Sequence, residues 1–145
     1  MLRAPLAVEW VKSKKYRYKS HPENPWLHKI SAFDFITAQL DRHAANWILD
    51  NELRVYAIDN GYSFSKEDDR RFLKCNVGKY LVGQPVHEET IELVKKVDEH
   101  KIWRVLQNRG FRRGEAEGVL KRLEEMKKLR VWGIMGGMWD PDAKK

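Results

Sequence analysis

The 145-residue chain is 42% hydrophobic and 34% charged, a composition typical of one globular domain with its own core. Its single cysteine, Cys75, excludes an internal disulfide framework and a cysteine-based zinc site, and no apolar run approaches the ~18 residues of a membrane span. The net charge of +7 is divided unevenly, since residues 1–30 carry +5, residues 31–75 carry −2 and residues 76–145 carry +4. An acidic centre that suits a divalent cation therefore lies between basic flanks.

Residues 1–25 are interpreted as a basic and aromatic N-terminal arm. Lysines and arginines alternate there with Trp10, Tyr16 and Tyr18, and residues 21–25 are typical of a turn. We expect this arm to dock on a protein partner or on a second copy of the chain. Nucleic acid is not an expected partner, because the sequence has no helix-turn-helix, zinc-finger or RNP-like motif. The arm also lacks the long apolar stretch of a signal peptide, which predicts a cytoplasmic protein.

Residues 27–40 are predicted to form a helix that is buried against the rest of the chain. Apolar residues recur in it at helical spacing: Ile30, Phe33, Ile36 and Leu40, with Phe35 adjacent. This helix would lead directly into Asp41.

The segment after this helix carries the candidate chemistry. It contains an acid, an amide five positions later and a second acid thirteen positions after that, as Asp41, Asn46 and Asp59. This spacing is typical of a phosphoryl-transfer site, in which the first Asp orients a substrate hydroxyl and the other two side chains hold magnesium. Taken singly, each residue has a simpler interpretation. The Asp-Asn-Gly at 59–61 is by itself typical of a hairpin turn, and a lone His43 is more often a capping or interior histidine.

The residues between the amide and the second acid predict a β-hairpin. Residues 47–49 and 53–58 are apolar enough for two short strands around a turn at 50–52. A hairpin of this length would bring Asn46 and Asp59 to the same end, where their oxygen atoms could reach one metal–phosphate cluster.

The loop residues together carry a family resemblance. Asp-Arg-His-x-x-Asn-Trp at 41–47 and Ala-Ile-Asp-Asn-Gly-Tyr-Ser-Phe at 57–64 resemble the catalytic and metal-binding loops of the phosphatidylinositol 3/4-kinase-like superfamily. They look most like its bacterial and phage branch, which is related to the type II lipid kinases. The resemblance runs from about residue 30 to residue 126 and covers what would be the C-terminal lobe of a kinase.

This resemblance implies a fold and a set of roles. The fold would be α+β and mostly helical, a kinase C-lobe-like domain with a small hairpin carrying both loops. Asp41 would be the catalytic base, and Arg42 and His43 would orient its loop. Asn46 and Asp59 would bind Mg²⁺ and, through it, ATP.

Further helices are predicted after the hairpin. Ser65 begins a short helix to about residue 74, since Ser-x-x-Asp is close to a capping box. Two more are expected at 88–98 and 99–107, with a stop at Gly110. A last helix at about 114–129 has one apolar stripe: Ala116, Val119, Leu120, Leu123 and Met126.

A kinase also needs a Gly-rich cover over the phosphates and a lysine on a neighbouring strand. Five strands of ~5–6 residues with their connections exceed the roughly forty residues before Asp41, so we expect no complete N-terminal lobe within this sequence. The glycines at 110–114 and 133–137 lack a strand–loop–strand setting and are not expected to cradle phosphate.

Two functional hypotheses follow. The chain is either a phosphotransferase C-lobe that binds Mg²⁺-ATP and needs a partner or a reduced N-terminal lobe, or a catalytically inactive, kinase-derived module in a larger assembly. If the chain is encoded by a phage, its expected location is the virion. The expected domain plan is an arm at 1–25, a C-lobe-like domain at 26–130 and a Trp/Gly-rich tail at 131–145, with arm and tail as the expected contacts of a protein partner. The substrate class, whether lipid, protein or small molecule, is not indicated by the sequence.

Overall fold

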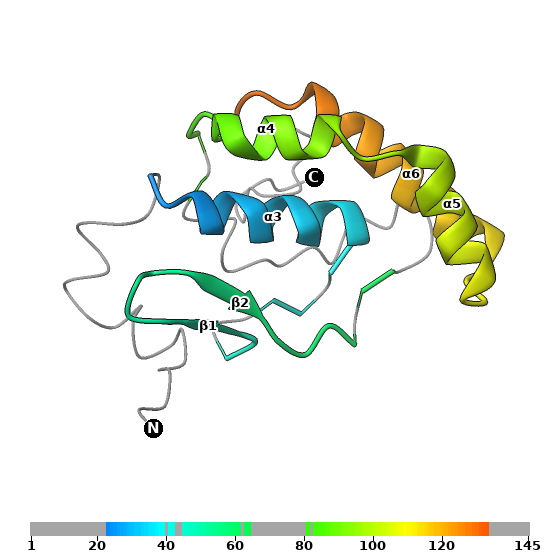
Figure 1. The fold of residues 1–145 in the computed structure, drawn as a ribbon, viewed down its shortest axis with the longest axis horizontal. Coiled ribbons are helices and arrows are strands. Elements are labelled where there is room, and N and C mark those ends of the chain that lie inside the picture. The colour runs from blue at the N-terminus through cyan, green and yellow to red at the C-terminus, as the bar shows by residue number, and fades with distance from the viewer. Residues whose placement is uncertain are drawn as a thin grey trace, which may run out of the picture.

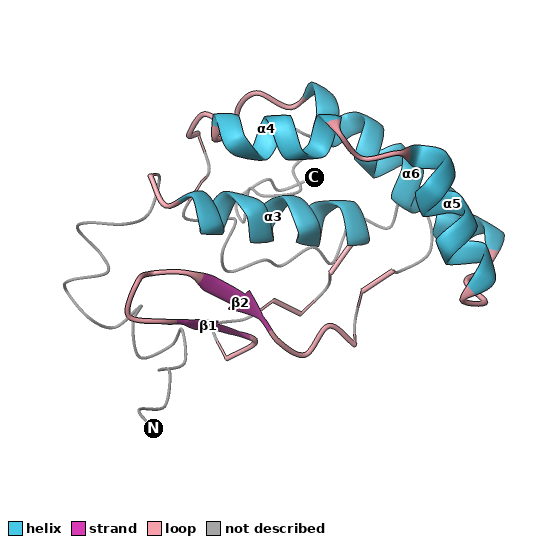
Figure 2. Cartoon of the chain, in the orientation of Figure 1, coloured by secondary structure: helices cyan, strands magenta, loops and turns pink. Residues whose placement is uncertain are grey.

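The computed structural model describes residues 23–39, 41–42, 45–61, 63–64, 81 and 83–133. The predicted arm before residue 23, the predicted helix at 65–74, His43 and the tail beyond residue 133 lie outside the described residues. The fold is α+β and mostly helical, as the sequence predicted, with one small antiparallel sheet (Figure 2).

Helix α3 (Pro25–Thr37) is the central element, with the hairpin on one side and the C-terminal helices on the other (Figure 1). Its start is fixed by Asn24, whose side-chain oxygen accepts a hydrogen bond from Trp26 N at 3.0 Å, and by proline at the first helical position. It ends where Ala38 adopts a left-handed conformation with φ of 50°.

The predicted helix at 27–40 is confirmed, with Ile30 buried and Ile36 packed against the core, but it ends at Thr37 and Phe33 of the predicted stripe is exposed. Phe33 is 43% exposed, whereas Phe35 is fully buried. Polar residues share the buried surface, including His28, Ser31 and Asp34. Because buried residues lie on several sides of α3, apolar spacing identified only part of its buried surface.

The predicted hairpin is present as β1 (Trp47–Leu49) and β2 (Val55–Ala57), an antiparallel pair in which Trp47 lies opposite Ala57. The second strand is shorter than predicted, because Leu53 adopts φ of 62° within the turn. Ile58 N also donates to Asn46 O at 3.0 Å, which extends the ladder by one step toward the candidate site.

Three helices complete the described fold: α4 (Glu88–Lys95), α5 (Glu99–Asn108) and α6 (Arg113–Lys128). They confirm the predicted helical zones, and the predicted stop at Gly110 has φ of 80°. The predicted stripe of α6 is buried except for half-buried Leu120. Helix α6 packs along α3, where Arg122 Nε donates to Ile36 O at 2.9 Å. None of the described helices has both the length and the apolar character of a membrane span.

The segments around residues 85 and 131 close the fold. Pro85 and Val131 form an antiparallel bridge, and Trp132 is fully buried in the main core cluster. His28 Nδ1 accepts hydrogen bonds from Trp132 Nε1 at 2.9 Å and from His87 N at 3.1 Å. The first tryptophan of the predicted tail is thus covered by the core of this chain, and α3 is tied to both closing segments.

Candidate functional site

The site is organised by a buried ion pair between α3 and the loop that follows it. Arg42 Nη2 lies 3.0 Å from Asp34 Oδ1, and Arg42 Nε lies 3.0 Å from Asp34 Oδ2. Both side chains are completely buried. These two contacts fix the orientation of the guanidinium plane, which a single contact would leave free to rotate.

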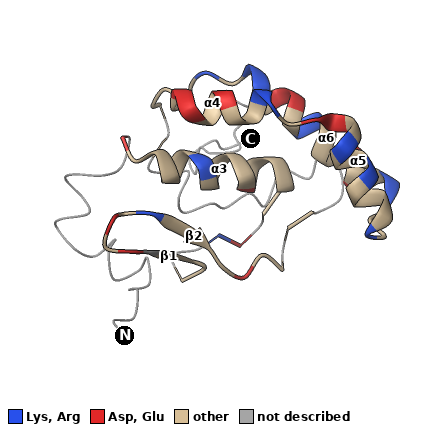
Figure 3. Cartoon of the chain, in the orientation of Figure 1, with Lys and Arg blue, Asp and Glu red and all other residues tan. Residues whose placement is uncertain are grey.

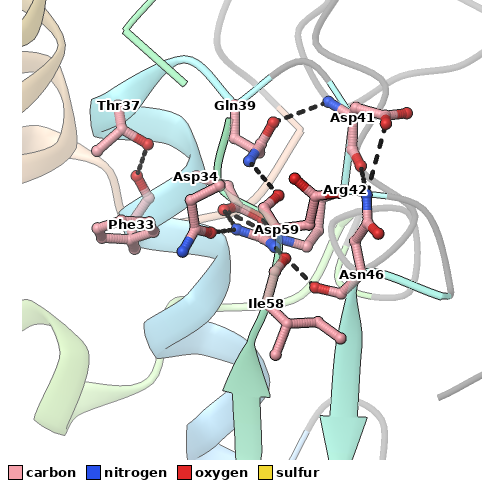
Figure 4. A network of polar contacts seen from close by, with 10 residues as sticks. Phe33, Asp34, Thr37, Gln39, Asp41, Arg42, Asn46, Ile58 and Asp59 are labelled. Carbon is pink, nitrogen blue, oxygen red and sulfur yellow. Dashed lines mark hydrogen bonds and ion pairs between the residues drawn. The ribbon is translucent and has the colours of Figure 1, made fainter. Parts of the chain in front are cut away.

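The remaining donors of Arg42 bind the start of β1 and the end of β2. Nη1 donates to the backbone oxygens of Asn46 at 2.7 Å and Ile58 at 2.6 Å, and Nη2 donates to Asn60 Oδ1. All five N–H groups of the guanidinium are therefore engaged. Figure 4 shows this head group between α3 and the hairpin end. One side chain thus sets the positions of both candidate loops.

Asn46 lies beside Asp41 at this end of the hairpin. Asn46 Nδ2 donates to Asp41 O at 2.7 Å, with Asp41 Oδ2 at 3.4 Å (Figure 4). Because the amide nitrogen is directed to Asp41, the amide oxygen is the atom that can serve a cation. Asn46 is 6% exposed, whereas Asp41 is partly open to solvent.

Asp59 follows the ladder at the same end of the hairpin as Asn46. Its backbone has φ of 50°, a left-handed conformation that Asp and Asn tolerate better than most residues. Gln39 joins it to the first loop, since Gln39 Oε1 accepts from Asp41 N at 3.0 Å and Gln39 Nε2 lies 3.5 Å from Asp59 O. Within the described residues, no side chain donates a hydrogen bond to the Asp59 carboxylate, which is exposed.

The fit of these residues to magnesium can be judged from their donor set. Asn46 and Asp59 offer an amide oxygen and a carboxylate, the hard oxygen ligands that Mg²⁺ takes. No group of three or more His, Cys, Asp or Glu that could hold a metal occurs among the described residues. Two protein oxygens match a cation that completes its shell with phosphate oxygens and water, but not a fully protein-ligated ion.

Three residues that organise the site were not singled out from the sequence: Asp34, Gln39 and Asn60. Asp34 carried a usable signal, because it is the one charged residue in the apolar stretch from 30 to 40. A carboxylate in a buried helix needs a partner, and Arg42 follows eight positions later. Gln39 and Asn60 act through loop geometry that spacing does not reveal.

Comparison with known proteins adds one partial relationship. Over 94 residues the chain is 31% identical to phosphatidylinositol 4-kinase gamma 3 of Arabidopsis thaliana, an alignment that covers 59% of this chain and 16% of the plant protein. No family model matches the chain, and no solved structure matches it. The chain is thus similar to a phosphatidylinositol kinase over part of its length, and it spans about a sixth of that relative.

Proposed function

We propose that this chain carries the catalytic and metal-binding loops of a kinase-like phosphotransferase that uses Mg²⁺-ATP. The observation that supports the proposal is the pair of hydrogen bonds that Arg42 Nη1 donates to the backbone oxygens of Asn46 and Ile58. These bonds fix the loop that carries Asp41 and Asn46 against the end of the hairpin that leads into Asp59. The similarity to a phosphatidylinositol 4-kinase supports the same class.

In the proposed reaction the chain's residues position the reactants and move one proton. Asp41 accepts the proton of the acceptor hydroxyl while the oxygen of that hydroxyl bonds to the γ-phosphorus. The bond from the γ-phosphorus to the β–γ bridging oxygen breaks, and ADP leaves with that electron pair. Bound magnesium supplies charge neutralisation at the phosphates, and Asn46 and Asp59 are the residues that would hold it. Arg42 acts as a positioning residue, and we keep the orienting role of His43 as a proposal from the family resemblance.

We also propose that the chain belongs to the bacterial and phage branch of the family. We propose in addition that it needs a partner or a reduced N-terminal lobe. Both proposals rest on the loop residues at 41–47 and 57–64 and on the spacing before Asp41. The acceptor hydroxyl could belong to a lipid, protein or small molecule, and the plant relative's name speaks for a lipid.

The test is calorimetric titration of the full chain with ATP, with and without Mg²⁺. We expect magnesium-dependent binding that Asp59→Asn abolishes, because the change removes the carboxylate charge. Asparagine is preferable to alanine here, since it tolerates the left-handed backbone of residue 59 and keeps the fold comparable.

Asp50→Asn is the matched control, because it makes the same chemical change at the opposite end of the hairpin. It should leave nucleotide binding unchanged. If a folded wild-type chain binds no ATP even with Mg²⁺, the chain alone is not a nucleotide-binding unit, and it is either the inactive, kinase-derived module or a lobe that needs its partner. If Asp59→Asn binds as the wild type does, Asp59 is a turn residue and the proposed metal site is wrong.

A further inference from the structure

A concentrated basic surface lies away from the candidate site, at the corner between α5 and α6. Residues 100–114 contain five Lys or Arg and no Asp or Glu. We call these five residues the basic corner: Lys101, Arg104, Arg109, Arg112 and Arg113. All five are exposed, and Figure 3 shows the basic positions gathered around this end of the two helices.

Among the described residues, most of these charges form no close ion pair, although the hydrogen bond from Lys101 N to Asp98 lowers the pKa of that carboxyl and Arg104 lies near enough to lower it further. Arg113 pairs with Glu117 at 2.7 Å on the surface of α6. Lys101, Arg104 and Arg109 form no ion pair among the described residues. Elsewhere on α5 and α6 acidic and basic side chains do pair, as Lys127 does with Glu99. The unbalanced charge makes the corner a site for a polyanion.

The corner also exposes apolar surface of a particular kind. Val105 is 48% exposed and lies on α5 beside Arg104 and one helical turn from Lys101. The aromatic rings of the corner, Trp103 and Phe111, are half-buried in the packing of α5 against α6. They offer no open platform on which nucleic-acid bases could stack. A cluster of basic residues with one exposed aliphatic side chain suits the anionic headgroup layer of a membrane.

The corner is connected to the candidate site through the loop that leaves Asp59. Phe64, five residues after Asp59, lies with its ring centroid 4.7 Å from that of Phe111, within the α5–α6 turn. Phe64 N also donates to Thr37 O at the end of α3. The loop after the proposed metal ligand is thus anchored between α3 and the basic corner.

We propose that the basic corner binds the surface of an anionic phospholipid bilayer. Phosphate and carboxylate headgroups would pair with the lysine and arginine side chains, and Val105 would enter the headgroup layer. The role of this contact rests on the proposed function, because it would hold the catalytic loops at the membrane where a lipid hydroxyl is presented. The binding itself needs no nucleotide.

The experiment is flotation of the full chain with vesicles of phosphatidylcholine alone and of phosphatidylcholine with phosphatidylserine. We expect binding to the second vesicles, weakening as salt is added. The double variant Arg104→Glu/Arg109→Glu should bind them at least about tenfold more weakly, because each basic residue near such a surface adds to the attraction.

The control is Lys96→Glu/Lys128→Glu, which changes net charge equally at exposed positions outside the corner. It should retain most of the binding. Equal losses in both variants would mean that net charge alone acts, and the corner would not be a site. Absence of vesicle binding would overturn the proposal. Binding of a single-stranded RNA that only the corner variant loses would also overturn it, and would identify the corner as a nucleic-acid site.

Failure here is separable from failure of the proposed function. The corner variant should still bind Mg²⁺-ATP in the calorimeter, and Asp59→Asn should still bind vesicles. Each proposal therefore has a variant that leaves the other intact.

Discussion

Asp34 and Arg42 carry opposite charges in a place from which water is excluded, and this makes each dependent on the other. Removing two ions from water costs free energy. Their mutual attraction offsets this desolvation penalty only when the geometry is good and further hydrogen bonds are made. Arg42 has both, since its other donors meet backbone oxygens of the two loops. The pair thus serves chiefly to fix a conformation of the loops.

Asp34→Asn should lower the free energy of unfolding by about 3–5 kcal/mol, because it leaves the buried Arg42 charge without its counter-ion. Urea unfolding measures the change. The double variant Asp34→Leu/Arg42→Met is the comparison, since removing both charges should cost less than removing one. A loss below about 1 kcal/mol for Asp34→Asn would show that the pair is not buried as described.

At this scale the sequence indicated the candidate residues of the motif, and it did not indicate the residues that support their loops. Asp41, Asn46 and Asp59 belong to a spaced pattern, and a pattern can be recognised. Asp34 belongs to no spaced motif, and its lone charge in an apolar stretch is a weaker signal. Its importance depends on burial, which apolar spacing does not fix residue by residue. Phe33 was placed in the core for the same reason, although Phe35 occupies it.

At the scale of elements, the hairpin is held at both ends by side chains. At the turn, Asp50 Oδ1 accepts from the backbone N–H groups of Glu52 and Arg54 at 2.9 Å, and Asp50 Oδ2 accepts from Arg54 Nε at 2.6 Å. Burial acts to raise the pKa of Asp50, but these hydrogen bonds outweigh it and hold the pKa below its usual value of 3.8.

Asp50→Asn should therefore destabilise the chain in a pH-dependent way. Because the folded-state pKa is lowered, the charged side chain stabilises the fold above about pH 3.8, and this contribution is lost as the pH falls through the lower, folded-state pKa. Thermal unfolding should show a gap in Tm between wild type and variant at neutral pH that narrows as the pH falls below 3.8 and through the folded-state pKa. A gap that stays constant with pH would assign the effect to the turn backbone instead of the charge.

Elements with a strong local signal were predictable, and their exact environments were not. The amphipathic stripe of α6 gave its core face correctly except for half-buried Leu120. The hairpin was predictable because two short apolar runs flank a polar turn. The shortening of β2 depends on the positive φ of Leu53. A leucine rarely adopts this conformation, so the sequence does not predict it.

At the scale of the whole molecule, α3 joins parts of the chain that are far apart in sequence. Its Ile36 O is bound by Arg122, 86 residues later, and its His28 by Trp132, 104 residues later. His28 Nδ1 receives two donors, so this nitrogen is the unprotonated one. The fold is closed by a polar contact inside an apolar core.

Trp132→Phe should lower the free energy of unfolding by about 1–3 kcal/mol, because it removes the hydrogen bond to His28 and leaves unfilled space around the smaller ring. Thermal or urea unfolding gives the value. Trp26→Phe is the matched control, since Trp26 is 38% exposed and a phenyl ring can still lie under Lys29. Equal losses in the two variants would contradict a closing role for Trp132.

The engagement of every Arg42 donor has a consequence for charge balance. Asp34 is paired with Arg42, and the exposed carboxylate of Asp59 adds a negative charge at the described hairpin end. A triphosphate approaching it meets repulsion that no guanidinium here is available to relieve. Nucleotide affinity should accordingly rise with the concentration of divalent cation, and any lysine or arginine that grips the phosphates must come from a segment outside this hairpin end.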